Sequence, residues 1–131
     1  MRIALQIPFS VEIDVVETDD RLPSMCCKLT IEAKQFQQRL HFVDRVWMPC
    51  STWDSFVKGL AFDDCANAEL FDIERRVVFR VSKSAAGYQF SFEGGRMHSN
   101  GVVGKVTILA PLDRDEFSVV AREFADFERW W

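Results

Sequence analysis

Residues 51–60 (STWDSFVKGL) and residues 113–124 (DRDEFSVVAREF) decide the fold of this chain. In the first stretch Trp53, Phe56 and Leu60 recur with the spacing of one helix face. The second stretch repeats this apolar periodicity with phenylalanine and valine. Each stretch therefore predicts an amphipathic helix, and each helix closes one half of the chain.

Capping residues mark the start of both predicted helices. Ser51 is suited to accept a hydrogen bond from a free backbone N–H group at the first helix N-terminus. Asp113 and Glu116 have the spacing of a capping box, with aspartate in place of the usual serine or threonine. The apolar stripe of the second helix comprises Phe117, Val120, Ala121, Phe124, Phe127 and Trp131.

Strands are predicted ahead of each helix by alternation of apolar and polar residues. Val11 and Ile13 flank Glu12 in the first half, and Val77 and Phe79 begin a similar run in the second half. Period-two alternation places one set of side chains against a core and the other toward water. It favours antiparallel pairing, because strands of a buried parallel sheet are apolar on both faces.

Together these patterns predict an α+β fold with the element order ββββ-α-ββββ-α. We expect a single antiparallel sheet of about 7–8 strands, with the two amphipathic helices packed on one face. Residues 1–131 are expected to form a single domain of two similarly organised halves, 1–64 and 65–131. The glycine-rich segment 94–101 is expected to be a hairpin connection, because no helix follows it as a phosphate loop requires.

Composition indicates a folded protein rather than a disordered one. The chain has 131 residues, 48% of them hydrophobic, with 12 phenylalanines. No apolar run approaches the length of a membrane span, and the N-terminus has no signal-peptide pattern. The four cysteines, which lack metal-site spacing, are expected to be reduced thiols of a cytoplasmic protein: Cys26, Cys27, Cys50 and Cys65.

Charge argues against a nucleic-acid-binding protein. The formal net charge is −4, with 20 acidic and 16 basic residues, and no basic stripe is visible. Acidic residues cluster within 12–20 and within 63–74. Such clusters are either solvated strand faces and turns or a surface that attracts a basic protein partner.

No residue pattern predicts a catalytic, cofactor or metal site. His41 falls on the polar side of a predicted strand and His98 in a loop, and neither belongs to a ligand or nucleophile motif. A pair formed by Cys65 and His98 stays open, because catalytic groups meet in space rather than in sequence. We therefore expect that the chain is not an enzyme and has no cofactor.

The sheet face opposite the helices is the expected site of recognition. It is mostly polar, so it is either simply solvated or a rigid surface on which a protein docks. The terminal Trp130 and Trp131 are expected to pack at the core edge, with a contact to another chain as the alternative. The candidate partner-binding residues are Arg39, His41, Trp47, Arg80, Arg96 and His98.

The order of the predicted elements resembles that of a known family. The stretches that carry the resemblance are residues 53–60 (WDSFVKGL), 68–81 (AELFDIERRVVFRV) and 113–117 (DRDEF). The resemblance is to the wall-associated-protein type immunity family and related small bacterial domains. It implies a cytoplasmic protein that binds a cognate toxin domain and neutralises it by occlusion. It carries over no site residues, because that family lacks a defining functional motif.

Two other functions stay open. One is a small-ligand-binding or regulatory module that uses the open sheet face or the 94–101 loop. The other is an enzyme of unrecognised type. A protein partner is expected in preference to nucleic acid or membrane, and homodimer formation is a further alternative.

Overall fold

The computed structural model describes residues 1–61, 66–97 and 99–131. Four strands precede each helix, as the element order predicted. The first half contains β1 (Arg2–Leu5), β2 (Ser10–Asp19), β3 (Ser24–Gln35), β4 (Gln38–Pro49) and α1 (Cys50–Ala61). The second half contains β5 (Asn67–Phe71), β6 (Val77–Ser84), β7 (Gly87–Met97), β8 (Val103–Leu112) and α2 (Arg114–Ala125).

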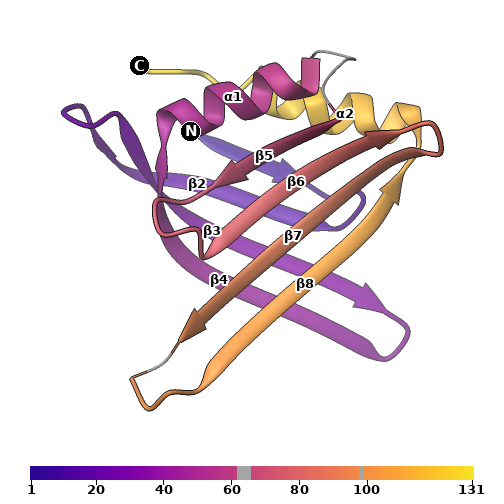
Figure 1. Cartoon of the computed structure of the whole chain (residues 1–131), viewed down its shortest axis with the longest axis horizontal. Helices are drawn as coiled ribbons and strands as arrows, with labels where there is room; N and C mark the ends of the chain where they lie inside the picture. Colours follow the sequence, from indigo (N-terminus) through magenta and orange to yellow (C-terminus); the bar gives the residue numbers. More distant parts are fainter. Residues whose placement is uncertain (62–65, 98) are drawn as a thin grey trace.

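Within the described residues, the strands form two four-stranded antiparallel sheets. The N-terminal sheet has the order β1-β2-β3-β4 and the C-terminal sheet the order β5-β6-β7-β8, so strands that follow one another in sequence are paired within each sheet. The C-terminal sheet lies in front of the N-terminal sheet in Figure 1, with its strands crossing those behind. Both helices run along the upper end of the two sheets.

The apolar faces of the two sheets are buried against each other. Phe9 stacks on Phe90 with ring centroids 5.2 Å apart, and Phe42 meets the edge of Phe92 at the same distance. These two pairs join the N-terminal sheet and its β1–β2 connection to β7. One hydrophobic core therefore contains residues from both halves of the chain.

The helices connect the halves in a reciprocal way. α1, from the first half, packs against β5, whereas α2, from the second half, packs against β1. An aromatic seam joins the helices, in which the Phe124 ring lies 5.4 Å from Trp53 and 4.9 Å from Phe56. Neither helix of the described part of the chain is long and apolar enough to cross a membrane.

The helix starts follow the sequence with one shift. The capping box of α2 is present, because Asp113 accepts from the Glu116 N–H group and Glu116 accepts from the Asp113 N–H group. α1 begins at Cys50, so Ser51 lies inside its first turn rather than at the cap. The Cys50 N–H group instead donates to the Pro23 carbonyl at 2.8 Å, which ties the helix to the β2–β3 turn.

The α+β class and the element order are confirmed, but the expectation of one continuous sheet is wrong. The helices cover the end of a two-sheet stack rather than one face of a single sheet. Alternation along a strand shows only that one face of the strand is buried. It does not show whether a helix or a second sheet covers that face. The terminal Trp130 and Trp131 pack against the core, as expected.

Glycines 94 and 95 lie inside strand β7 rather than in the predicted connection. A Cβ atom at Gly94 would stand only 2.8 Å from the rings of Phe42 and Phe92. Glycine here therefore allows the aromatic contact between the sheets, which is the close approach that glycine permits within a strand.

The buried position of Phe124 predicts a large effect of truncation. We expect Phe124→Ala to lower the free energy of unfolding by about 3–5 kcal/mol and to remove most soluble expression. The matched control is Val119→Ala on the same helix, where the side chain is exposed. A melting temperature of Phe124→Ala within about 2 °C of wild type would contradict the packing described here.

The β3–β4 turn carries a conformational cost at Phe36. This residue has φ 56° and a side chain that is 98% exposed. We expect Phe36→Asn to raise the free energy of unfolding by about 1 kcal/mol, because asparagine tolerates left-handed backbone better. Urea denaturation would measure the change, with Gln37→Asn as the neighbouring control. A loss of stability in Phe36→Asn would count against this reading.

Candidate functional site

The turn between β5 and β6, residues 72–76, is fixed to both sheets. The Ile73 N–H group donates to the Trp47 carbonyl of β4 at 2.9 Å. The Asp72 carboxylate, which is 1% exposed, accepts from the Val77 N–H group at 2.9 Å. The Arg75 N–H group closes the turn onto the Asp72 carbonyl at 3.0 Å. These bonds make the turn a preformed feature of the surface.

Arg75 adopts an uncommon backbone conformation in this turn. Its φ is 53°, in the left-handed region, which is costly for a residue with a side chain. The conformation places the guanidinium 4.1 Å from the centre of the Phe71 ring and 3.4 Å from a Glu69 carboxylate oxygen. Uncommon backbone conformations held by their surroundings are concentrated at functional sites.

An apolar groove of about 520 Å³ lies on one side of the turn. The β2–β3 turn, the end of β4 and the start of α1 form it. Leu22 is 77% exposed and Ile73 61% exposed, which is unusual for large apolar side chains that stand together. The groove is lined by Asp19, Leu22, Pro23, Ser24, Trp47, Pro49, Ser51 and Ile73.

A basic hollow of about 770 Å³ lies on the other side of the turn. Its centre is a row of paired residues on β6, β7 and β8, namely Val78, Glu93 and Thr107. These residues alternate with the buried core positions, so they face outward. The hollow is lined by Glu74, Arg75, Arg76, Val78, Glu93, Gly94, Gly95, Arg96, Val103, Lys105, Val106 and Thr107.

Gly95 lies between two of the cationic residues of the hollow. It pairs with Lys105 of β8, and its N–H group donates to the Arg76 carbonyl at 3.0 Å. A Cβ atom here would come within 3.0 Å of the Gly104 carbonyl oxygen. The Lys105 Cγ atom would stand 3.3 Å from the same Cβ position, so glycine here allows β8 and the Lys105 side chain to pack closely against β7.

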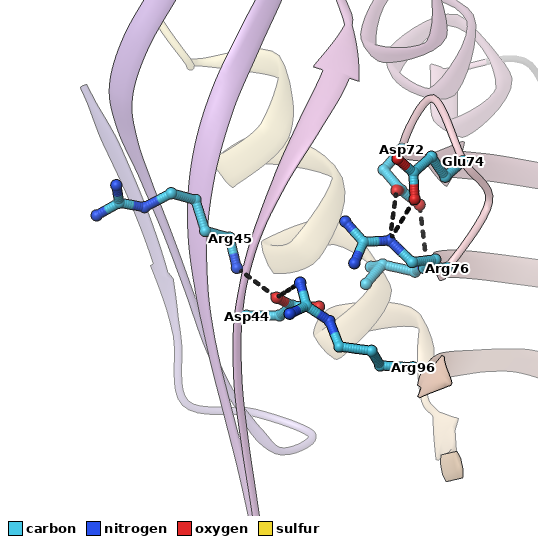
Figure 2. A network of polar contacts seen from close by, with 7 residues as sticks. Asp44, Arg45, Asp72, Glu74, Arg76 and Arg96 are labelled. Carbon is cyan, nitrogen blue, oxygen red and sulfur yellow. Dashed lines mark hydrogen bonds and ion pairs between the residues drawn. The ribbon is translucent and has the colours of Figure 1, made fainter. Parts of the chain in front are cut away.

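The C-terminal sheet differs in charge from the rest of the chain. Residues 66–112 contain six Lys or Arg and four Asp or Glu, although the whole chain has a net charge of −4. Arg76 lies 3.0 Å from Glu74, and Arg96 reaches Asp44 of β4 at 3.0 Å (Figure 2). Within the described residues, no carboxylate lies within ion-pair distance of Lys105. The lining of the hollow thus carries four cationic side chains against the two carboxylates of Glu74 and Glu93, in a protein with a net charge of −4.

Two of the residues predicted for partner binding lie beside the turn. Trp47 lines the apolar groove, and Arg96 lines the basic hollow. Arg80 faces outward from β6, where its Nε atom lies 3.4 Å from Glu69. His98 lies outside the described residues.

The other two predicted residues lie on a different face. Arg39 and His41 belong to the outer face of the N-terminal sheet, where both contact one carboxylate oxygen of Glu32, at 3.0 and 2.7 Å. The hydrogen bond from Arg39, followed by that with His41, lowers the pKa of the Glu32 carboxyl from its ordinary value. The predicted set is therefore divided between at least two surfaces.

Sequence reasoning missed the two most exposed apolar groups of the groove. Leu22 lies in the β2–β3 turn and Ile73 in the β5–β6 turn. In hindsight each is a lone large apolar residue among charged or turn-forming neighbours. That pattern was the available signal, but the contact between the turn and Trp47 could not be inferred from sequence spacing.

The described cysteines are buried and protonated at neutral pH. Burial raises the pKa of the Cys27 thiol to about 12 and that of Cys50 to about 11, and it also raises the pKa of Cys26. A thiol is a poor nucleophile or metal ligand in that state. Cys65 and His98, the pair considered above, lie outside the described residues. In the part of the chain that the structure describes, no three metal-ligating side chains come together.

Comparisons of the chain with protein-family models, curated proteins and solved structures returned no match. An exposed turn held rigid between an apolar groove and a basic hollow is suited to recognition.

The buried Asp72 carboxylate predicts a measurable contribution to stability. We expect Asp72→Ala to lower the free energy of unfolding by about 2 kcal/mol, because the Val77 N–H group loses its acceptor in a buried place. Asp20→Ala, at an exposed turn, is the control and should change it by less than about 0.5 kcal/mol. Equal urea midpoints for the two variants would show that Asp72 does not hold the turn.

Proposed function

We propose that this chain is a protein-binding domain of the immunity type, which acts in the cytoplasm and neutralises a cognate toxin domain by occlusion. The observation that carries the proposal is the pair of exposed apolar side chains, Leu22 and Ile73, beside Trp47 on a fixed turn. Exposure of large apolar side chains to water is unfavourable in free energy, and their burial at an interface stabilises a complex.

The rigidity of the turn supports binding of a protein in particular. A surface already in its bound shape loses little conformational entropy when a partner docks. The Ile73 and Arg75 N–H groups are both used within the protein, so they need no new partner in a complex. Ile73 is then free to serve as an apolar anchor, and the groove beside it can receive an anchor from the partner.

Occlusion needs no chemistry from the chain. A partner that covers the apolar groove and part of the basic hollow would have its own surface blocked by the domain. Trp47 and Arg96 are the predicted contacts that fit this mode, one on each side of the turn. Arg39, His41 and Arg80 would contribute only if the partner extends across the outer sheet faces.

A small anionic ligand is the second candidate, favoured by the basic hollow alone. The volume of about 770 Å³ lies within the range of small-molecule sites. The hollow also adjoins the 94–101 segment, which was one of the sites considered from the sequence. In this case the domain would be a regulatory module rather than an inhibitor of a toxin.

The proposal predicts a toxin gene beside this gene in its native operon, and co-expression with the toxin domain that it encodes is the test. Wild-type chain should protect the cells, and Ile73→Lys should lower affinity for the toxin domain at least tenfold, as expected when an interface anchor is lost. Val43→Lys, which changes an exposed residue on the N-terminal sheet, is the matched control.

Both variants should keep the wild-type melting temperature, so that folding and binding are separated. Protection by Ile73→Lys equal to that by wild type would contradict the use of the groove. A native operon without any toxin gene would contradict the immunity assignment itself.

A further inference from the structure

The basic hollow and the apolar groove share the β5–β6 turn as their common wall. Ile73 lines the groove, whereas Glu74, Arg75 and Arg76 line the hollow. A chain segment that crosses the turn would therefore meet the groove first and the cationic hollow a few residues later. The two recesses are one surface with an apolar end and a basic end.

The cations of the hollow are accessible to carboxylates of a partner. The side chains of Arg75 and Arg96 are 56% and 52% exposed. The Arg75–Glu69 pair is a surface pair, which is worth little and is readily shared with another carboxylate. Asp44, the partner of Arg96, is only 11% exposed, so that pair is held more firmly. Lys105 is exposed, and no ion pair within the described residues involves it.

The shape of the hollow suits an extended segment better than a compact group. It spans three adjacent strands, β6, β7 and β8, and Gly95 adds no side chain to its lining. β8 is an edge strand, so the hollow is open on that side as well. A segment can enter at the turn and leave over β8 without a change in the sheet.

We propose that the surface binds a partner segment in which a large apolar residue is followed, a few residues later, by two or more carboxylates. This inference rests on the proposed protein-binding function and names the chemistry of the partner at that site. The apolar side chain lies in the groove beside Ile73, and the carboxylates lie in the hollow near Arg75 and Lys105. Charge complementarity accounts for the choice, because this sheet is cationic in an acidic protein.

The experiment is an NMR titration of the full chain with a synthetic peptide that carries a leucine followed by a run of glutamates. Binding should shift the amide signals of Gly95 and Lys105 together with that of Ile73. The affinity should fall about fivefold in Lys105→Gln, which corresponds to the loss of one exposed charge pair. It should also weaken as salt is added, since exposed charges are screened.

Lys28→Gln is the matched control, because Lys28 is an exposed lysine on the outer face of the N-terminal sheet. The control should bind the peptide as wild type does. Equal binding to all three proteins, or equal binding of a peptide with lysine in place of glutamate, would overturn the proposal. So would saturation of Gly95 and Lys105 by inorganic phosphate or free glutamate at the concentration at which the peptide binds, which would assign the hollow to a small anion.

Failure of this inference is distinguishable from failure of the proposed function. In one outcome, Lys105→Gln protects cells and binds the toxin domain as wild type does, while Ile73→Lys does neither. The groove then binds a protein, but the partner does not place an acidic segment in the hollow. If the wild-type chain does not protect cells while the glutamate peptide still binds the hollow, the immunity function is wrong and the charge chemistry of the hollow stands.

Discussion

Two apolar sheet faces that cannot be left in water impose the main constraint on this structure. Each four-stranded sheet has one such face, and each face is removed from water by packing against the other. The Phe9–Phe90 and Phe42–Phe92 contacts lie where the faces meet. The helices close the end of the stack, and each packs on a strand from the other half of the chain. Neither half buries its apolar surface alone, so a disturbance in one half should be felt in the other.

This constraint also explains how the candidate site is held. The β5–β6 turn lies where the C-terminal sheet meets the end of β4, and its Ile73 N–H group bonds across to Trp47. Asp72 is buried there and holds the start of β6. Hydrogen bonds thus fix the backbone of the turn to both sheets, whereas the side chains of Ile73 and Arg75 are exposed. Core packing requires neither exposed side chain, which leaves both of them available for recognition.

Local features of the fold were predictable from sequence because they depend on residues close together in the chain. The helical stripes, the Asp113 capping box and the strand alternation are of this kind, and they were sufficient for the α+β class and the element order. The division into two sheets was not predictable, because alternation is the same whether a helix or a sheet covers the buried face. Gly94 was placed in a loop for a similar reason, since its role depends on Phe42, which is distant in sequence. The candidate site was predicted only at Trp47 and Arg96, because the pairing of Ile73 with Trp47 arises from packing between the halves.

The recognition surface depends on a β5–β6 turn that is preformed in the free protein. Native-state hydrogen exchange of the Ile73 and Val77 amides measures this directly, with the Ala86 amide of the exposed β6–β7 turn as the internal reference. We expect both amides to exchange within about tenfold of the Phe79 amide in the core, through global unfolding alone. Exchange of Ile73 as fast as that of Ala86 would show that the turn opens independently, and the surface described here would not exist before a partner binds.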